Sequence, residues 1–570
     1  FFFAHTMTQR IQLTSFIEQP EIAAGAAQNL LVMASLRAPD IAKFQGHVQA
    51  RAPVSVSAVI DRSSSMKHRL ELTKAALRFV IGHLTDDDEF GIVTYAGSIK
   101  TALRLTHMTA RGRARAIAAL DGIKAQGYTN LSDGLLAGVH QLVGSRPGSR
   151  RGSLVPRRAS AAAVGDQPLP TAPAPSCFGG LRHLFLPAEA PADVEKGELP
   201  EPPAAAPQRV AAVWLFTDGV ATEGICETAE LVEATRMKLQ DLTTPCSLFC
   251  FGLGTGVDAR TLRELAGVGN GMYYHIKSSQ EIAPAFADCL GGLLSVVAQD
   301  VRLTLEVRKG CALRKLWTPY ANHLTTSSAW VQIPDLYSEE ERDILVEIAV
   351  AALEPGVVVP EAKPIVEWSV QYVNAVTGQT DAVQAPALLS RPVVARVQPR
   401  PVELDEQRNR VLCAGHLESA RSLADSGKLD EARAVLEAAA AAIESSPSAS
   451  EAYCVGLRDD LKECISQMSD NVTYTTTGTH TMSNLDSCHS YQRSCGVGDR
   501  YVTRTKSSMI LESAEACAPQ GLDPTRLPPP RRPSVVMKCV QMCRHMMQSK
   551  AEGTLHRGTT SAYIVQSQPR

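Results

Sequence analysis

Two stretches of the sequence are continuously apolar, and each is followed closely by an aspartate. The first covers residues 54–60 and precedes Asp61, and the second covers residues 211–217 and precedes Asp218. Strands without polar alternation are typical of parallel sheets whose two faces are both covered by helices. We therefore expect two buried, parallel strands, each with a carboxylate at its carboxyl end.

The remainder of the first 300 residues alternates between the strand pattern and the helix pattern. Further strands are predicted at 89–96, 101–108, 247–254 and 272–277, and helices at 67–84, 110–123, 131–143, 258–268 and 279–298. Alternation of this kind predicts an α/β fold with a doubly wound, mostly parallel sheet. In such sheets ligands bind at the carboxyl edge of the strands, where the amino termini of the helices also point.

Five oxygen-bearing side chains are predicted to meet at that edge. They are Asp61, Ser63 and Ser65 in an Asp-x-Ser-x-Ser turn, Thr129 before a predicted helix, and Asp218 after the second apolar strand. Carboxylates and hydroxyls are hard ligands that suit Mg²⁺ or Ca²⁺. Each motif alone has a simpler interpretation as a turn or a helix N-cap. Together they favour a metal site.

The same motifs resemble those of the von Willebrand factor type A domain and its metal-ion-dependent adhesion site. The resemblance rests on residues 59–66, Tyr128-Thr129 and 216–219, and it covers about residues 53–298. Ser64 stands where many members have glycine, and serine tolerates this turn.

The resemblance implies a set of roles for these residues. The two serines would ligate the metal directly, and the threonine and both aspartates would act directly or through water. The ion would be Mg²⁺, with Ca²⁺ or Mn²⁺ as alternatives, and an open position would accept an Asp or Glu of a protein partner. No histidine or glutamate base lies at a useful spacing on this edge, so we expect binding and no catalysis.

A long interval separates Thr129 from Asp218, and residues 145–208 within it look like an insertion. They are rich in Pro, Ala, Ser and Arg, a composition that predicts disorder because too little apolar surface is available for burial. Arg-Arg-x-Ser sequences make Ser153 and Ser160 candidate phosphorylation sites, and Ser534 in the tail is a third.

Beyond the type A region the pattern changes twice. Short alternating segments at 299–401 predict a β-sandwich, which the similar segment at 1–52 would complete. Residues 402–469 predict a helical bundle or hairpin, and residues 470–570 an irregular, largely disordered tail.

The tail carries a second resemblance, through Cys488-His489-Ser490-Tyr491-Gln492-Arg493, Tyr501-Val502-Thr503 and Met509. This region resembles the one downstream of the type A domain in plant RING-type ubiquitin ligases. The zinc-binding RING itself is missing, since the chain contains no Cys-x-x-Cys. Because the chain does not begin with Met, a fragment of a longer ligase is one alternative.

Composition limits the classes of function that this chain can have. The 570 residues carry a net charge of −2 and a pI near 6.8, which gives no general attraction to nucleic acid or membranes, and no segment predicts a membrane span. Fourteen unpatterned cysteines indicate reduced thiols and a cytoplasmic location. We expect a metal-dependent adaptor or scaffold. The alternatives are the substrate-recognition part of a ligase, or a secreted adhesion protein whose signal peptide would lie upstream.

Overall fold

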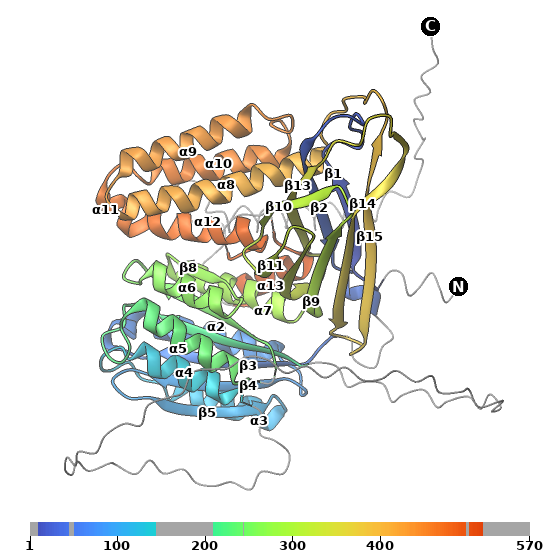
Figure 1. The fold of residues 1–570 in the computed structure, drawn as a ribbon. Coiled ribbons are helices and arrows are strands. Elements are labelled where there is room, and N and C mark those ends of the chain that lie inside the picture. Colours follow the sequence, from blue (N-terminus) through green and yellow to red (C-terminus); the bar gives the residue numbers. More distant parts are fainter. Residues whose placement is uncertain (1–8, 45–50, 144–208, 243, 497–500, 517–570) are drawn as a thin grey trace, which may run out of the picture. The chain divides into compact units, whose positions relative to one another are not determined.

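The computed structural model describes residues 9–44, 51–143, 209–242, 244–496 and 501–516. Along the chain these residues build an α/β domain, a β-sandwich and a set of carboxyl-terminal helices (Figure 1). The predicted fold class is confirmed.

The α/β domain is organised around a six-stranded sheet with the order β5-β4-β3-β6-β7-β8. The strands are β3 (Val54–Asp61), β4 (Glu89–Tyr95), β5 (Lys100–His107), β6 (Val210–Thr217), β7 (Cys246–Leu253) and β8 (Tyr273–Ile276). All neighbours are parallel except β4 and β5. Every residue of β3 and β6 is buried, as their unbroken apolar sequences predict.

Helices cover both faces of this sheet. They are η2 (Ser64–His68), α2 (Leu70–His83), α3 (Ala110–Asp121), α4 (Leu131–Gln141), α5 (Thr228–Gln240), α6 (Ala259–Val268), η3 (Ser279–Glu281) and α7 (Ile282–Leu293). One hydrophobic core contains side chains of α2, α3 and α7, and the other contains side chains of α4, α5 and α6. The sequence did not reveal α5, because only Leu231 and Thr235 of that helix are buried and its apolar periodicity is weak.

The predicted helix at 279–298 is wrong at its carboxyl end. Helix α7 stops at Leu293, and strand β9 begins at Val296. The apolar run that joins them fits either structure, and two consecutive β-branched valines favour the strand. The sandwich therefore starts within the segment that was assigned to the α/β domain.

Two sheets pack face to face in the sandwich. The strands are β1 (Gln12–Ile17), β2 (Gln28–Arg37), β9 (Val296–Val307), β10 (Cys311–Trp317), β11 (Ala321–Leu324), β12 (Ser328–Tyr337), β13 (Glu341–Val350), β14 (Val359–Asn374) and β15 (Thr380–Arg391), and the short helix η1 (Ile41–Phe44) follows β2. Their orders are β1-β2-β13-β10 and β11-β12-β9-β14-β15. One core fills the space between the sheets, and Trp368 Nε1 donates to Ser15 Oγ at 3.1 Å. The amino-terminal strands are thus part of the sandwich.

The carboxyl-terminal helices extend well beyond the predicted bundle. They are α8 (Val402–Asp425), α9 (Leu429–Glu444), α10 (Ala452–Ser466), α11 (Asn471–Thr473), the π-helix η4 (Tyr474–Gly478), α12 (Thr479–Tyr491) and α13 (Arg504–Ala516). The prediction of an irregular segment from residue 470 is therefore wrong for the described part of it. Helix α12 is rich in Ser, Thr, Asn and His, yet most of it is buried, so its polar side chains depend on tertiary partners. Residues 517–570 lie outside the described part of the chain.

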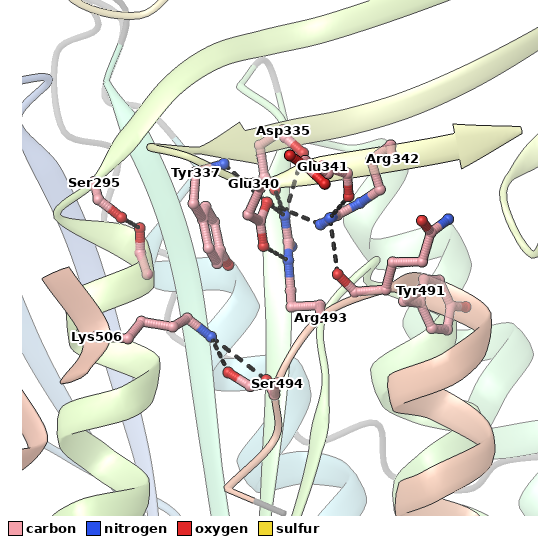
Figure 2. A network of polar contacts seen from close by, with 12 residues as sticks. Ser295, Asp335, Tyr337, Glu340, Glu341, Arg342, Tyr491, Arg493, Ser494 and Lys506 are labelled. Carbon is pink, nitrogen blue, oxygen red and sulfur yellow. Dashed lines mark hydrogen bonds and ion pairs between the residues drawn. The ribbon is translucent and has the colours of Figure 1, made fainter. Parts of the chain in front are cut away.

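A buried polar network joins the segment after α12 to the sandwich (Figure 2). Arg493 donates to Asp335 Oδ1 at 2.8 Å and to Glu340 Oε2 at 2.9 Å, and its guanidinium carbon lies 3.8 Å from the centre of the Tyr337 ring. Arg342 donates to the same Glu340 oxygen at 2.8 Å. Burial pushes the pKa of Glu340 upward, but the two guanidinium groups outweigh it and lower the pKa to about 2.

The same segment also reaches the α/β domain. Ser494 Oγ donates to Asp288 Oδ1 on α7 at 2.8 Å, and Lys506 Nζ of α13 lies 3.2 Å from Asp288 Oδ2. The part of the tail that resembles the plant ligases is therefore the connection between the sandwich, the α/β domain and the helices.

Candidate functional site

The candidate site lies at the carboxyl ends of β3 and β6. The two strands are parallel neighbours, with Ile60 beside Phe216, so the residues that follow emerge together at one edge of the sheet. Asp61 is the last residue of β3, and Asp218 comes directly after β6. The sheet register thus brings together two carboxylates that are 157 positions apart.

Four of the five predicted residues are joined in one hydrogen-bonded row, through their side chains and the Ser63 backbone. The backbone N–H of Ser63 donates to Asp61 Oδ1 at 2.7 Å. The hydroxyl oxygens of Ser63 and Ser65 lie 3.0 Å apart. Ser65 Oγ donates to Asp218 Oδ1 at 2.7 Å, so the row leads from one aspartate through both serines to the other.

The backbone of Thr129 is held beside this row from both sides. The N–H of Ser64 donates to the carbonyl of Gly127 at 3.1 Å, which ties the loop before Thr129 to the Asp-x-Ser-x-Ser turn. On the other side, Thr222 of the loop after β6 donates its N–H to the Thr129 carbonyl at 2.9 Å and accepts the Thr129 N–H on its hydroxyl at 3.1 Å. Gly127 has φ +87°, a conformation that favours glycine.

Helix α4 sets the position of Thr129, because the helix starts two residues later and packs unusually close to the sheet. A Cβ on Gly134 would lie 2.6 Å from the Tyr95 ring of β4, and one on Gly138 would lie 2.1 Å from a side-chain carbon of Val59 in β3. These two glycines face the sheet four residues apart, where side chains would force the helix outward. The close approach draws the start of α4 toward the strand ends.

The two aspartates differ in their electrostatic surroundings. Asp61 is fully buried, and burial raises its pKa to about 6 in spite of the hydrogen bonds from Ser63 and Thr217. Its second oxygen accepts from Thr217 Oγ1 at 3.0 Å. No basic side chain among the described residues forms an ion pair with Asp61, whereas Asp218 Oδ2 lies 3.0 Å from Arg69 Nη1.

Arg69 also belongs to this site, although the sequence motifs did not predict it. Its guanidinium lies so close to Gly254, at the end of β7, that a Cβ there would be 2.4 Å from Arg69 Nη2. Gly254 has φ +86°, so both the backbone conformation and the space favour glycine. The sequence feature that could have pointed to Arg69 is its place four positions after Ser65, one turn into the helical segment that follows.

The donor set fits a hard divalent cation. Two serine hydroxyls and two carboxylates lie together at this edge, and Thr129 is held next to them through its backbone. Asp61 is buried without a positive partner among the described residues, so a cation would stabilise its charged form. Within the described ranges no group of three or more His, Cys, Asp or Glu side chains is placed to hold a metal. A metal at this edge would therefore depend on the hydroxyls as well as the carboxylates.

Several predictions fall on residues that the structure does not describe. Ser153, Ser160 and Ser534, the candidate phosphorylation sites, lie outside the described residues, and so does the predicted insertion at 145–208.

In the described part of the chain, no helix has the length and apolar character needed to cross a membrane.

Comparisons with known proteins agree with the motifs. Two family models, both described as von Willebrand factor type A domain, match residues 56–159 and 190–275. A solved von Willebrand factor type A protein from Catenulispora acidiphila superposes with a TM-score of 0.54 at 16% identity, over 83% of this chain and 97% of that one. This likeness concerns the fold.

A plant protein is similar in sequence. The chain is 24% identical over 310 residues to the E3 ubiquitin-protein ligase WAV3 of Arabidopsis thaliana, over 53% of this chain and 31% of the ligase. The chain thus spans about a third of the length of this curated relative.

A structure of proximal thread matrix protein 1 from the mussel byssus has a zinc-occupied MIDAS motif. It matches at a TM-score of 0.29 and 14% identity, over 44% of this chain and 49% of that one, which is too low to bear on the present site.

The family matches, the strand order and the motif positions lead to one conclusion: this chain contains a von Willebrand factor type A domain.

Proposed function

We propose that the protein is an adaptor or scaffold that binds a protein partner through a metal ion at the edge of β3 and β6. The observation that carries this proposal is the hydrogen-bonded row from Asp61 through Ser63 and Ser65 to Asp218. Carboxylate and hydroxyl oxygens are the hard ligands that suit Mg²⁺, and a divalent cation would compensate the charge of the buried Asp61.

In this proposal Asp61, Ser63, Ser65, Thr129 and Asp218 hold Mg²⁺, with Ca²⁺ or Mn²⁺ as substitutes. When bound, the ion supplies an electrophilic position for a carboxylate of the partner. The chain's own residues have two tasks. The Thr217 and Ser63 hydrogen bonds orient Asp61, and the Thr222 contacts hold the Thr129 loop in place.

The partner is a protein that offers an Asp or Glu. Nucleic acid is a poor candidate, because the net charge is −2 and the site itself is acidic. We place the protein in the cytoplasm, because none of the ten described cysteines is joined in a disulfide and most of them are buried.

The test is a calorimetric Mg²⁺ titration of the full chain and of two variants. Asp218→Ala should abolish measurable binding, since it removes one of the two carboxylates. Asp87→Ala, which alters an exposed aspartate before β4 at the opposite edge of the sheet, should leave the isotherm unchanged. Equal Mg²⁺ affinity in wild type and Asp218→Ala would refute the proposed site.

A second candidate function has one specific observation in its favour, the 24% identity to a plant ubiquitin ligase. In that case the chain would be the substrate-recognition part of a RING-type ligase truncated at its amino terminus, and catalysis would belong to a RING domain absent from these 570 residues. Sequencing the 5′ end of the transcript decides the matter. Paired Cys and His upstream of Phe1 would support the ligase, and an upstream region without them would exclude it.

A further inference from the structure

An open hollow of about 530 Å³ adjoins the candidate metal site. It begins at Ser64, the residue between the two serines of the Asp-x-Ser-x-Ser turn, and continues between α2 and the end of α3. Three lysines line it, Lys67, Lys74 and Lys124. The hollow is therefore continuous with the surface on which a partner's carboxylate would approach the metal.

The charges in this hollow are not balanced. Lys74 is nearly buried, with its Nζ 2.8 Å from Glu71 Oε1 and 2.7 Å from the Ile123 carbonyl, so it already has partners. Asp121, the other acid in the hollow, is paired with Arg78.

Two cations remain once these pairs are set aside. Lys67 and Lys124 are exposed, and neither has an ion-pair partner among the described residues. The hollow thus offers two ammonium groups without an ion-pair partner in the described ranges, and it begins at the turn that carries the proposed metal site.

We propose that the partner segment is acidic at two positions, with one carboxylate on the metal and a second acidic side chain over Lys67 and Lys124. This inference rests on the proposed function and adds the partner's charge pattern to it. The second contact selects among acidic segments, because a lone Asp or Glu reaches only the metal whereas a segment with two acids also neutralises the hollow.

The two ammonium groups of the hollow would bind the second carboxylate of a protein segment through weak contacts. Both ammonium groups are solvent-exposed, so each contact is weak and sensitive to salt. Selectivity then arises because the two acids are on one segment, and the second contact forms at a high effective concentration once the first is made.

The experiment compares two kinds of synthetic peptide. NMR titration in Mg²⁺ measures their binding to the full chain, so that weak affinities can be determined. The first is a peptide with a single Glu in a Gly-Ser background, and the second is a set of peptides with two Glu residues separated by one to five Gly or Ser. We expect the best two-acid peptide to bind about tenfold more tightly than the single-acid peptide, as two exposed ion pairs allow. EDTA should abolish binding of both.

The variant Lys67→Gln/Lys124→Gln should erase the advantage of the second acid and leave single-acid binding within about twofold. Lys67→Glu/Lys124→Glu should go further and make the second acid a disadvantage, because like charges then repel each other in the hollow. Lys309→Glu/Lys462→Glu makes the same charge change at exposed lysines of the β9–β10 turn and of α10, and it should preserve the advantage.

The outcomes separate the two proposals. If no peptide binds in a Mg²⁺-dependent way, the proposed function fails. If the single-acid peptide binds and a second acid adds nothing at any spacing, the proposed function stands and the two-acid inference is wrong. Much tighter binding of a peptide with phosphoserine at the second position would also overturn it, by assigning the hollow to phosphorylated segments.

Discussion

Arg69 should weaken Mg²⁺ binding, and replacing it with methionine should strengthen it. The guanidinium pairs with Asp218 Oδ2 at 3.0 Å, so Asp61, Asp218 and Arg69 together carry a charge of −1. In Arg69→Met that charge becomes −2, and Asp218 is free to face the ion with both oxygens. Methionine keeps much of the apolar length of the side chain.

The size of the expected change in Mg²⁺ affinity follows from the distance between the two charged groups and from the exposure of the Arg69 side chain. Two unit charges 3.0 Å apart interact by about 1.4 kcal/mol in water and by about 5.5 kcal/mol at an effective dielectric constant of 20. The Arg69 side chain is 38% exposed, so the screened end of this range applies, about 1 kcal/mol. We expect Mg²⁺ affinity to rise about fivefold.

Calorimetric Mg²⁺ titration at low ionic strength measures this change, and the chain offers a matched control. Arg113 pairs with Asp86 at the same distance of 3.0 Å, with a side chain 30% exposed, away from the metal edge. Arg113→Met should leave Mg²⁺ affinity unaltered. A weaker or unchanged affinity in Arg69→Met would refute the reasoning, and a weaker one would show that Arg69 orients Asp218 for the ion.

Three further predictions concern stability, measured by urea unfolding with a separate probe for each domain. Arg493→Met leaves Asp335 and Glu340 buried with less positive charge and should destabilise the protein by about 3 kcal/mol or more. The exposed Arg308→Met should cost less than about 1 kcal/mol. Burial lowers the pKa of His480 to about 4 and that of the stacked His275 to about 3. The unfolded chain therefore takes up protons first, and stability should fall as the pH drops from about 6.5 to 4. His480→Gln should flatten that fall, and an unchanged pH profile would exclude His480 as a cause. Gly138→Ala should destabilise by about 1–3 kcal/mol, because the new Cβ would lie 2.1 Å from a side chain of β3; wild-type stability would show that α4 can shift.

The α/β domain was predictable because its signals are local. Unbroken apolar runs marked β3 and β6, and the residues after them marked the candidate site. The failures have equally local reasons. Helix α5 buries too few residues to show a period, and the apolar run at 293–298 suits a helix or a strand.

The tail shows the limit of composition. Helix α12 looks polar enough to be irregular, but Asp486 meets Arg263 at 3.1 Å, and His480 Nδ1 lies 3.1 Å from the Tyr273 hydroxyl. Side chains from the α/β domain thus satisfy the polar groups of a buried helix. No window of the sequence contains both partners, so no pattern within it reveals that the segment folds.

The sequence by itself determined the strands of the type A domain, most of its helices and the residue types at its carboxyl edge, because backbone periodicity and motif spacing are properties of neighbouring residues. Only the tertiary structure decided that, among the described residues, Asp61 has no ion-pair partner while Asp218 is paired with Arg69. It also decided that Lys67 and Lys124, which have no ion-pair partner in the same ranges, line the hollow that begins at Ser64. Those properties depend on which distant side chains come within a few ångströms of one another, and electrostatic free energy depends on that distance and on burial, not on position along the chain.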